Sequence, residues 1–243
     1  GGHSDFVRNP DVQAFLAECD YMRAPSDDEG NAMAATFSKA PGGSPLQLPD
    51  YVVASDASKS DTPINDKLPS TQIGFIKVSH VLIEMAKYAD LIDPKTRFVD
   101  PFKAADLHRN ASPVTYTLPG SNIRFQNAKT VKDGFRRAVF KQLSSDKASG
   151  GASRLILTDT LLTLNDGAIN LDKCSSCGET SDFSFDSGTL MHVCTACNEP
   201  VFLTDWLRLH EDISDFGNNT SAMTRMMNAV EHLLIDRKST RLN

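Results

Sequence analysis

Four cysteines in two pairs constrain the fold of this chain more than any other feature of its sequence. They are Cys174 and Cys177 in CSSC, and Cys194 and Cys197 in CTAC. Sixteen residues separate the two pairs. Tetrahedral Zn²⁺ takes four thiolates, and each C-x-x-C turn lets two sulfurs converge on one ion. The spacing therefore predicts a zinc ribbon with these four ligands.

Other interpretations of the cysteines are less favourable. Two disulfides would suit a secreted chain, but the sequence has no charged-then-apolar leader. A redox-active C-x-x-C would not require two copies. Because protein ligands fill all four positions, the predicted zinc is structural. Apolar and polar residues alternate around Asp186 and Gly188, which predicts a hairpin that brings the pairs together. Cys19 lies on an apolar helical face, where a core position is expected.

The composition is that of an ordinary globular chain, with 40% hydrophobic and 23% charged residues. No run approaches the roughly 20 apolar residues that a membrane-spanning helix needs, so we expect a cytoplasmic protein without a membrane partner. The net charge of −6 argues against a surface coated with positive charge for nucleic acid. It does not exclude a nuclease, which needs clustered carboxylates and only a local basic track.

One such basic track lies between Ser121 and Lys147, a stretch that contains seven basic and two acidic residues. Within it, Thr130 to Leu143 has one apolar stripe and a threonine at its start, which predicts an amphipathic helix capped by Thr130. A solvated helix face explains these charges as well as a nucleic-acid track does. The functional alternative places Lys132, Arg136 and Arg137 against the DNA backbone.

Apolar periodicity elsewhere predicts a mixture of strands and helices. Short helices are expected at 11–23 and 27–37, a strand at 51–55, a strand and meander at 71–85, short extended pieces at 98–102 and 113–119, a buried strand around 155–157 and a long helix at 220–235. The sequence therefore predicts an α/β fold.

Asp56 stands where an apolar stretch, VVAS, runs into small polar residues. Two-metal phosphodiester hydrolysis needs several carboxylates that converge on ions roughly 4 Å apart. Such sites commonly begin with an aspartate on a central strand. An aspartate that merely ends a strand fits the pattern almost as well, so the residues alone leave both roles open.

The stretch VVASDASKS resembles the first motif of the NurA nuclease family, in which an apolar strand runs into Asp-Gly-Ser. Further stretches are similar to the bacterial branch of this family that carries a zinc-ribbon insertion. They are LPSTQIGFIKVSHVLIEM, the opening GGHSDFVRNPDVQAFLAECDYMR, VKDGFRRAV and the final DFGNNTSAMTRMMNAVEHLL. The resemblance keeps a consistent order up to Ile235.

The resemblance implies an RNase H-like mixed sheet with flanking helices and an inserted zinc ribbon. It implies a Mn²⁺- or Mg²⁺-dependent DNA nuclease that works with a hexameric HerA-type ATPase in DNA end processing or phage defence. Asp56 matches the first metal-binding aspartate of the family, and Glu231 matches its catalytic glutamate. Without the family, Glu231 would be interpreted as an exposed residue at a helix edge. We also expect a homodimer.

The chain departs from the family pattern at two points. Ala57 follows Asp56 where the family has glycine. The second family aspartate begins an Asp-Gly strand after the glutamate helix, and we expect the sequence to end before it. The residues around Asp159 resemble that strand in pattern, but they precede the zinc insertion. An aspartate at this position also fits the end of a strand or the start of a helix. We therefore expect this fragment to be weakly active or inactive.

A different class of function competes with the nuclease: a non-enzymatic zinc-ribbon module that binds nucleic acid or a partner protein. The expected organisation follows the nuclease interpretation. It comprises an N-terminal helical segment (1–48), the first part of the RNase H-like core (49–172), the zinc-ribbon insertion (173–202), a helical continuation of the core (203–236) and a non-native tail (237–243).

Overall fold

The computed structural model describes residues 8–19, 24–39, 49–93, 95, 97–108, 113–148 and 155–239. The side chains of 106–108 and 237–239 are outside that description, as are residues 240–243 of the expected non-native tail. The chain divides into two compact units, Gly1–Gln47 and Leu48–Asn243. Each is considered separately.

The first unit contains two short helices, α2 (Pro10–Ala17) and α3 (Asp27–Ala35). Local caps start both of them. The Asn9 side chain accepts a hydrogen bond at α2, and Ser26 forms a reciprocal capping box with Glu29 at α3. Neither helix buries a residue, and Cys19 is only half-buried. The expectation that Cys19 belongs to a core is therefore wrong, because the described part of this unit has no core around it.

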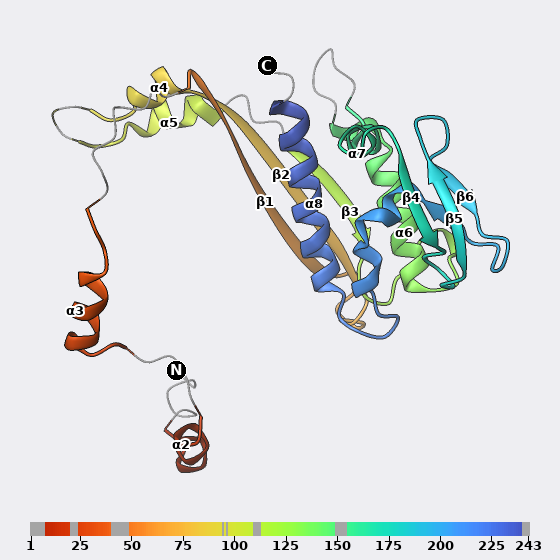
Figure 1. Cartoon of the computed structure of the whole chain (residues 1–243), viewed down its shortest axis with the longest axis horizontal. Helices are drawn as coiled ribbons and strands as arrows, with labels where there is room; N and C mark the ends of the chain where they lie inside the picture. The colour runs from red at the N-terminus through yellow and green to blue at the C-terminus, as the bar shows by residue number, and fades with distance from the viewer. Residues whose placement is uncertain are drawn as a thin grey trace. The chain divides into compact units, whose positions relative to one another are not determined.

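The second unit is a mixed α/β fold with antiparallel sheets (Figure 1). Its strands are β1 (Tyr51–Pro63), β2 (Gln72–Glu84), β3 (Val114–Pro119), β4 (Ile169–Lys173), β5 (Thr180–Phe185), β6 (Met191–Val193) and β7 (Pro200–Phe202). Its α-helices are α4 (Met85–Ala89), α5 (Pro101–His108), α6 (Val131–Leu143), α7 (Leu157–Thr163) and α8 (Thr220–Ser239). Short 3₁₀ turns follow β3, α6 and β7: η1 (Phe125–Asn127), η2 (Asp146–Ala148), η3 (Leu203–Leu207) and η4 (Leu209–Asp212).

The larger sheet is an antiparallel meander in the order β1-β2-β3. β1 is longer than the sequence pattern predicted, since it continues through the polar residues to Pro63. Asp56 therefore lies inside a strand, opposite Ser79 of β2, and does not end one. Polar side chains are compatible with β1 because it is an edge strand whose residues are largely exposed.

One face of this sheet is covered by helices. Ile76 and Val78 of β2 point to that face and are fully buried. α8 runs along β1 and β2 (Figure 1), and it approaches β2 so closely that a side chain at Gly74 would collide with Met223. A larger residue at position 74 would therefore require the Met223 side chain to move.

The predictions for α6 and α8 are confirmed. Thr130 caps α6, and its Oγ1 accepts the backbone N–H of Asp133 at 3.0 Å. The apolar side of α8, including Met226 and Val230, is buried against the sheet. Among the described helices, none combines the length and the apolar character that a bilayer crossing requires.

The buried strand expected around 155–157 is wrong. These residues lead into the helix α7, whose Leu157, Leu161 and Leu162 are buried at helical spacing. α7 packs against α8. A short apolar run is not long enough for its periodicity to distinguish a strand from a helix. Here the helix is favoured because its buried leucines pack against α8.

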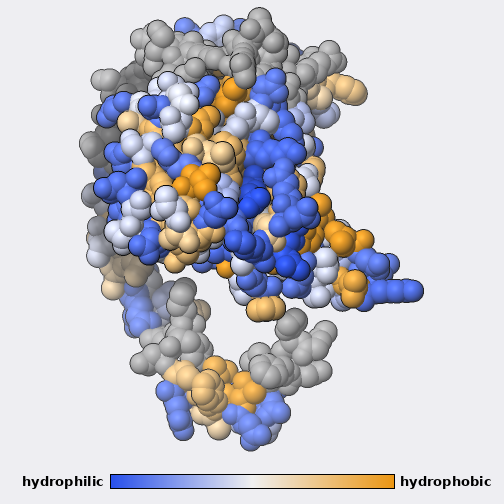
Figure 2. Space-filling model, turned by 90° about the vertical axis from the view of Figure 1, so that its right-hand side faces the viewer, coloured by the Kyte–Doolittle hydropathy of each residue, from blue (hydrophilic) through white to orange (hydrophobic). Residues whose placement is uncertain are grey.

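A single cluster of buried apolar side chains joins the larger sheet to the cysteine-bearing region. It includes Ile76 and Tyr116 of the sheet, Phe135 of α6, and Phe185 and Val201 of the two small sheets. On the side where β5 and β6 lie, the surface shows a band of strongly hydrophilic residues beside smaller apolar groups (Figure 2). The cysteine region is therefore part of the folded unit and shares its core.

Candidate metal centre

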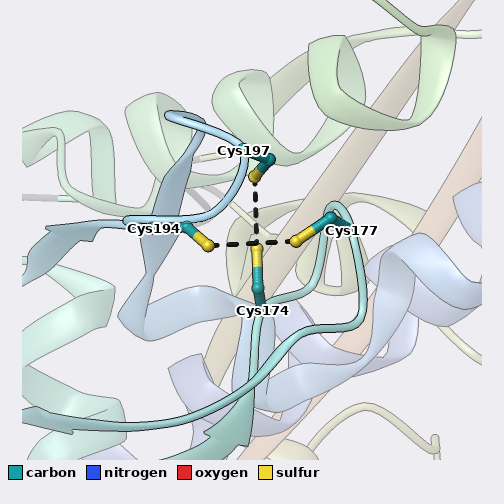
Figure 3. Close-up of side chains that lie close together, drawn as sticks. All are labelled: Cys174, Cys177, Cys194 and Cys197. Carbon is teal, nitrogen blue, oxygen red and sulfur yellow. Dashed lines mark hydrogen bonds between the residues drawn. The ribbon is translucent and has the colours of Figure 1, made fainter.

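The sulfurs of Cys174, Cys177, Cys194 and Cys197 converge on one point (Figure 3). Their ligand atoms all lie within 4.8 Å of one another. The Sγ atoms of Cys174 and Cys197 are 3.8 Å apart, as are those of Cys177 and Cys194. A tetrahedron with Zn–S bonds of about 2.3 Å has sulfurs about 3.8 Å apart. The cluster therefore has the size that a metal such as zinc requires.

The two cysteine turns have the same backbone structure. In the first, the Cys174 carbonyl accepts the N–H of Gly178 at 2.8 Å. In the second, the Cys194 carbonyl accepts the N–H of Asn198 at 2.9 Å. Gly178 and Asn198 both have positive φ, at 79° and 61°. Glycine and asparagine adopt this backbone region at little cost, which is why these residue types close the turns.

The strands pair differently from the expected hairpin between the two turns. β5 pairs with β4, and β6 pairs with β7, so each cysteine turn is the loop of its own small antiparallel sheet. β5 and β6 are connected through a tight turn in which the Asp186 carboxylate accepts the N–H of Gly188 at 2.8 Å. The predicted chain reversal is present, since Asp186 and Thr189 exchange two backbone hydrogen bonds at 3.2 Å, but the flanking strands pair with other partners, which alternation alone does not identify.

The four thiols differ in their electrostatic surroundings. Burial raises the pKa of Cys174 to about 12. The backbone N–H groups of Cys197 and Ala196 lower the pKa of Cys194 to about 7. Burial also raises the pKa of Cys197. Four thiolates are not stable together without a cation, and a bound metal ion supplies the charge that makes all four ionise.

A buried charge network joins the second cysteine turn to α6. The Arg136 side chain is 1% exposed. Its guanidinium donates to both carboxylate oxygens of Asp205, to Asp133 and to the Pro200 carbonyl. Asp205 also accepts the backbone N–H of Phe202 at 2.9 Å. The network fixes β7 and η3 on α6, and so positions one half of the metal centre.

Two further basic residues, Arg137 and Lys129, form ion pairs beside the same turn. Glu199, directly after the second cysteine pair, is buried and accepts from Arg137 at 2.6 Å and from Lys129 at 3.0 Å. These partners lower the pKa of the Glu199 carboxyl against the opposing effect of its burial. Of the seven basic residues in the track, only Arg136 is buried, so most of the positive charge lies at the surface.

The three residues expected to contact DNA are placed differently from one another. Arg136 is inside the protein, so the expectation that it meets a DNA backbone is corrected by its burial. Arg137 is paired with Glu199 and is 25% exposed. Lys132 is half-buried and forms no ion pair within the described part of the chain. Of the three, only Lys132 keeps its charge available to a ligand.

The predicted catalytic carboxylates do not form a group. Side chains alternate along β1, and Asp56 is exposed while its neighbour Ala57 packs on the core beneath α8. Glu231 lies on α8, which covers that opposite face. Asp159 is exposed in the first turn of α7. Among described residues, the four cysteines form the only group of three or more potential ligands.

The sequence predictions did not include the Arg136–Asp205 network or the surroundings of Trp206. Asp205 and Trp206 stand in a stretch without clear periodicity, DWLRLHEDISDF. The one available signal was that Trp206 is the single tryptophan of the chain.

Comparisons with known proteins do not extend this description. The chain matches no family model, and no curated protein or solved structure is significantly similar to it. The fold and the site define a class: a mixed α/β protein with a four-cysteine cluster that could bind a metal such as zinc and that shares the apolar core.

Proposed function

We propose that the four cysteines bind one structural Zn²⁺ ion as a zinc ribbon. The convergence of the four sulfurs at tetrahedral spacing carries this proposal. Four protein ligands leave no open position for a substrate or a reactive water, so the ion stabilises the fold. The repeated backbone structure of the two turns supports a shared ligand role.

The metal content of the purified protein tests this proposal. We expect one zinc ion per chain, released when the thiols of the four cysteines are modified, together with loss of the folded state. A protein that keeps its fold and releases no metal on thiol modification would contradict it.

We further propose that the chain belongs to a divalent-metal-dependent DNA nuclease of the NurA type with an RNase H-like core. Two observations support this. The motifs resemble that family in order, and the antiparallel meander β1-β2-β3 followed by α6 is an arrangement expected for the first part of such a core. In this proposal the protein is a cytoplasmic homodimer that acts on DNA with a HerA-type ATPase.

The proposed Mn²⁺ or Mg²⁺ ligands are Asp56 and Glu231. With the register described above, their side chains belong to opposite sides of the sheet. The exposed position of Asp56 favours the second candidate, a non-enzymatic zinc-ribbon module that binds nucleic acid or a partner protein.

Metal-dependent cleavage separates these two candidates. A protein that contains the whole chain is assayed with Mn²⁺ on DNA, alongside Asp56→Ala, Glu231→Ala and the exposed control Asp66→Ala. The nuclease proposal expects cleavage that both site variants abolish and the control retains. No cleavage, or cleavage unchanged by Asp56→Ala and Glu231→Ala, would contradict the nuclease proposal and favour the non-enzymatic module.

A further inference from the structure

A cavity of about 600 Å³ opens beside the first cysteine turn. On one side it is bounded by β4 and the turn that follows, and on the other by η3 and η4. Its side chains come from Lys132, Leu171, Asp172, Lys173, Trp206 and Arg208, among others. Small-molecule sites commonly measure about 300–1,000 Å³. The cavity is therefore large enough for one nucleotide.

Trp206 gives the cavity an aromatic wall. Its side chain is 40% exposed, although the neighbouring Asp205 and Leu203 are buried. Stacking of a base on an exposed aromatic ring is the usual way in which proteins hold unpaired nucleotides. An exposed tryptophan beside a polar cavity thus offers a surface for a planar, polar ligand.

Two of the basic residues that line the cavity are lysines without an ion pair in the described part of the chain. Lys132 enters from α6 and Lys173 from the end of β4, and neither forms an ion pair within the described residues. Other charges at the cavity are already matched. Arg208 donates to Glu211 at 2.8 Å, and Asp205 is held by Arg136. Asp172 is the one lining carboxylate without an ion pair among the described residues, and Lys173 also acts on the Glu211 carboxyl.

We propose that this cavity binds single-stranded DNA, with one base stacked on Trp206 and the adjoining phosphates at Lys132 and Lys173. The inference deepens the proposed function, on which it rests for the choice of DNA as the polymer. A single strand is required because the bases of a duplex are stacked on one another and are closed to the Trp206 ring. An aromatic ring in the same cavity as cationic side chains suits a single strand, whose bases can stack while its phosphates pair with the cations.

The fluorescence of the protein tests this inference directly, since Trp206 is the only tryptophan. Zinc-loaded protein is titrated with a short oligo-dT strand without added Mn²⁺ or Mg²⁺. We expect saturable quenching. The double variant Lys132→Ala/Lys173→Ala should weaken binding at least about tenfold and reduce the slope of log affinity against log salt by about 1.4.

The matched control is Lys67→Ala/Lys95→Ala, which removes the same charge from exposed positions outside the cavity. It should bind as the unaltered protein does. Fluorescence polarisation with labelled oligo-dT then compares Trp206→Phe, which keeps an aromatic ring, with Trp206→Ala, which should lose at least about fivefold in affinity. Zinc content and circular dichroism check the fold, and the lysine variants test the site even where Trp206→Ala is unfolded.

Absence of quenching overturns the inference, as do equal effects of the two lysine pairs or duplex binding as tight as that of oligo-dT. The outcomes also separate the two proposals. DNA cleavage without quenching overturns the cavity and leaves the nuclease. Quenching without cleavage supports the cavity and counts against the nuclease.

Discussion

Arg136 shows how a single residue connects the metal centre to the rest of the molecule. Its guanidinium is 1% exposed, and the partner carboxylates of Asp133 and Asp205 are 5% and 2% exposed. Burial opposes a charged arginine, but its two carboxylate partners hold the pKa of Arg136 above its ordinary value. A buried ion pair is costly to break, because the remaining charges have no water to solvate them.

Replacing Arg136 tests this network. Arg136→Met should lower the free energy of unfolding by about 3–5 kcal/mol, since it leaves two carboxylates buried without their cation. The control Arg225→Met breaks the exposed pair with Asp212 and should cost at most about 1 kcal/mol. Urea unfolding of the zinc-loaded proteins measures both. Equal losses would show that the buried network contributes no more than a surface ion pair.

His210 makes stability depend on pH. Burial lowers its pKa from 6.5 to about 4. Between these values the unfolded state binds a proton that the folded state does not, so the stabilisation is complete above pH 6.5 and is lost as the pH falls towards 4. The stabilisation is on the order of 3 kcal/mol, since one pKa unit corresponds to about 1.4 kcal/mol.

The variant His210→Gln removes this titration. Compared with the unaltered protein, its unfolding free energy should fall less between pH 6.5 and 4, whereas the exposed-position control His232→Gln should behave as the unaltered protein does. The comparison between proteins is needed because Asp133 and Glu199 also have lowered pKa values and lose their stabilising charge in acid. Identical pH profiles for all three proteins would refute the assignment to His210.

At the level of elements, each cysteine turn is the short loop that connects the two strands of a small antiparallel sheet. The first lies between β4 and β5 and the second between β6 and β7. The turns have local hydrogen bonds of their own, and the apolar cluster places the two sheets against each other. The ligands are therefore brought together by packing as well as by their spacing.

Cys177→Ser tests the contribution of one ligand. Since even groups that only support a ligand are worth about 10–100-fold in metal affinity, loss of a thiolate should weaken zinc binding by more than about 100-fold. Cys19→Ser is the matched control, because Cys19 is the one cysteine outside the cluster. Competition with a chromogenic zinc chelator measures both affinities. Normal zinc binding by Cys177→Ser would remove this residue from the ligand set.

At the scale of the whole molecule, the ribbon and the sheet share one apolar cluster. Phe185 and Val201 of the small sheets belong to the same cluster as Ile76 of β2 and Met223 of α8. Residues that share a core tend to unfold together. Zinc should therefore stabilise the entire second unit, including the distant sheet.

Zinc removal tests this coupling. With free zinc at a thousand times its dissociation constant, the metal should add about 4 kcal/mol to the unfolding free energy. Trp206 fluorescence and far-ultraviolet circular dichroism should report one transition that moves to lower temperature in the metal-free protein. Two separate transitions, with only the fluorescence change sensitive to zinc, would contradict a shared core.

Much of the secondary structure was predictable from local patterns. The α6 helix follows from a threonine cap and an apolar stripe, and α8 follows from its long apolar repeat. The pattern failed for α7 and for the length of β1, where the apolar runs were short or ended early. In both cases the secondary structure of the segment depends on the elements that pack against it. Short-range periodicity carries no information about those elements.

The sequence by itself determined the metal centre. The ligand types, their spacing and the residues that close each turn are all local, so four cysteines were enough to identify the site. Only the tertiary structure decided which side of the sheet Asp56 faces and that Arg136 is buried. Strand register, and the burial of a charge by partners about 70 residues away, depend on long-range pairing, which no local pattern encodes.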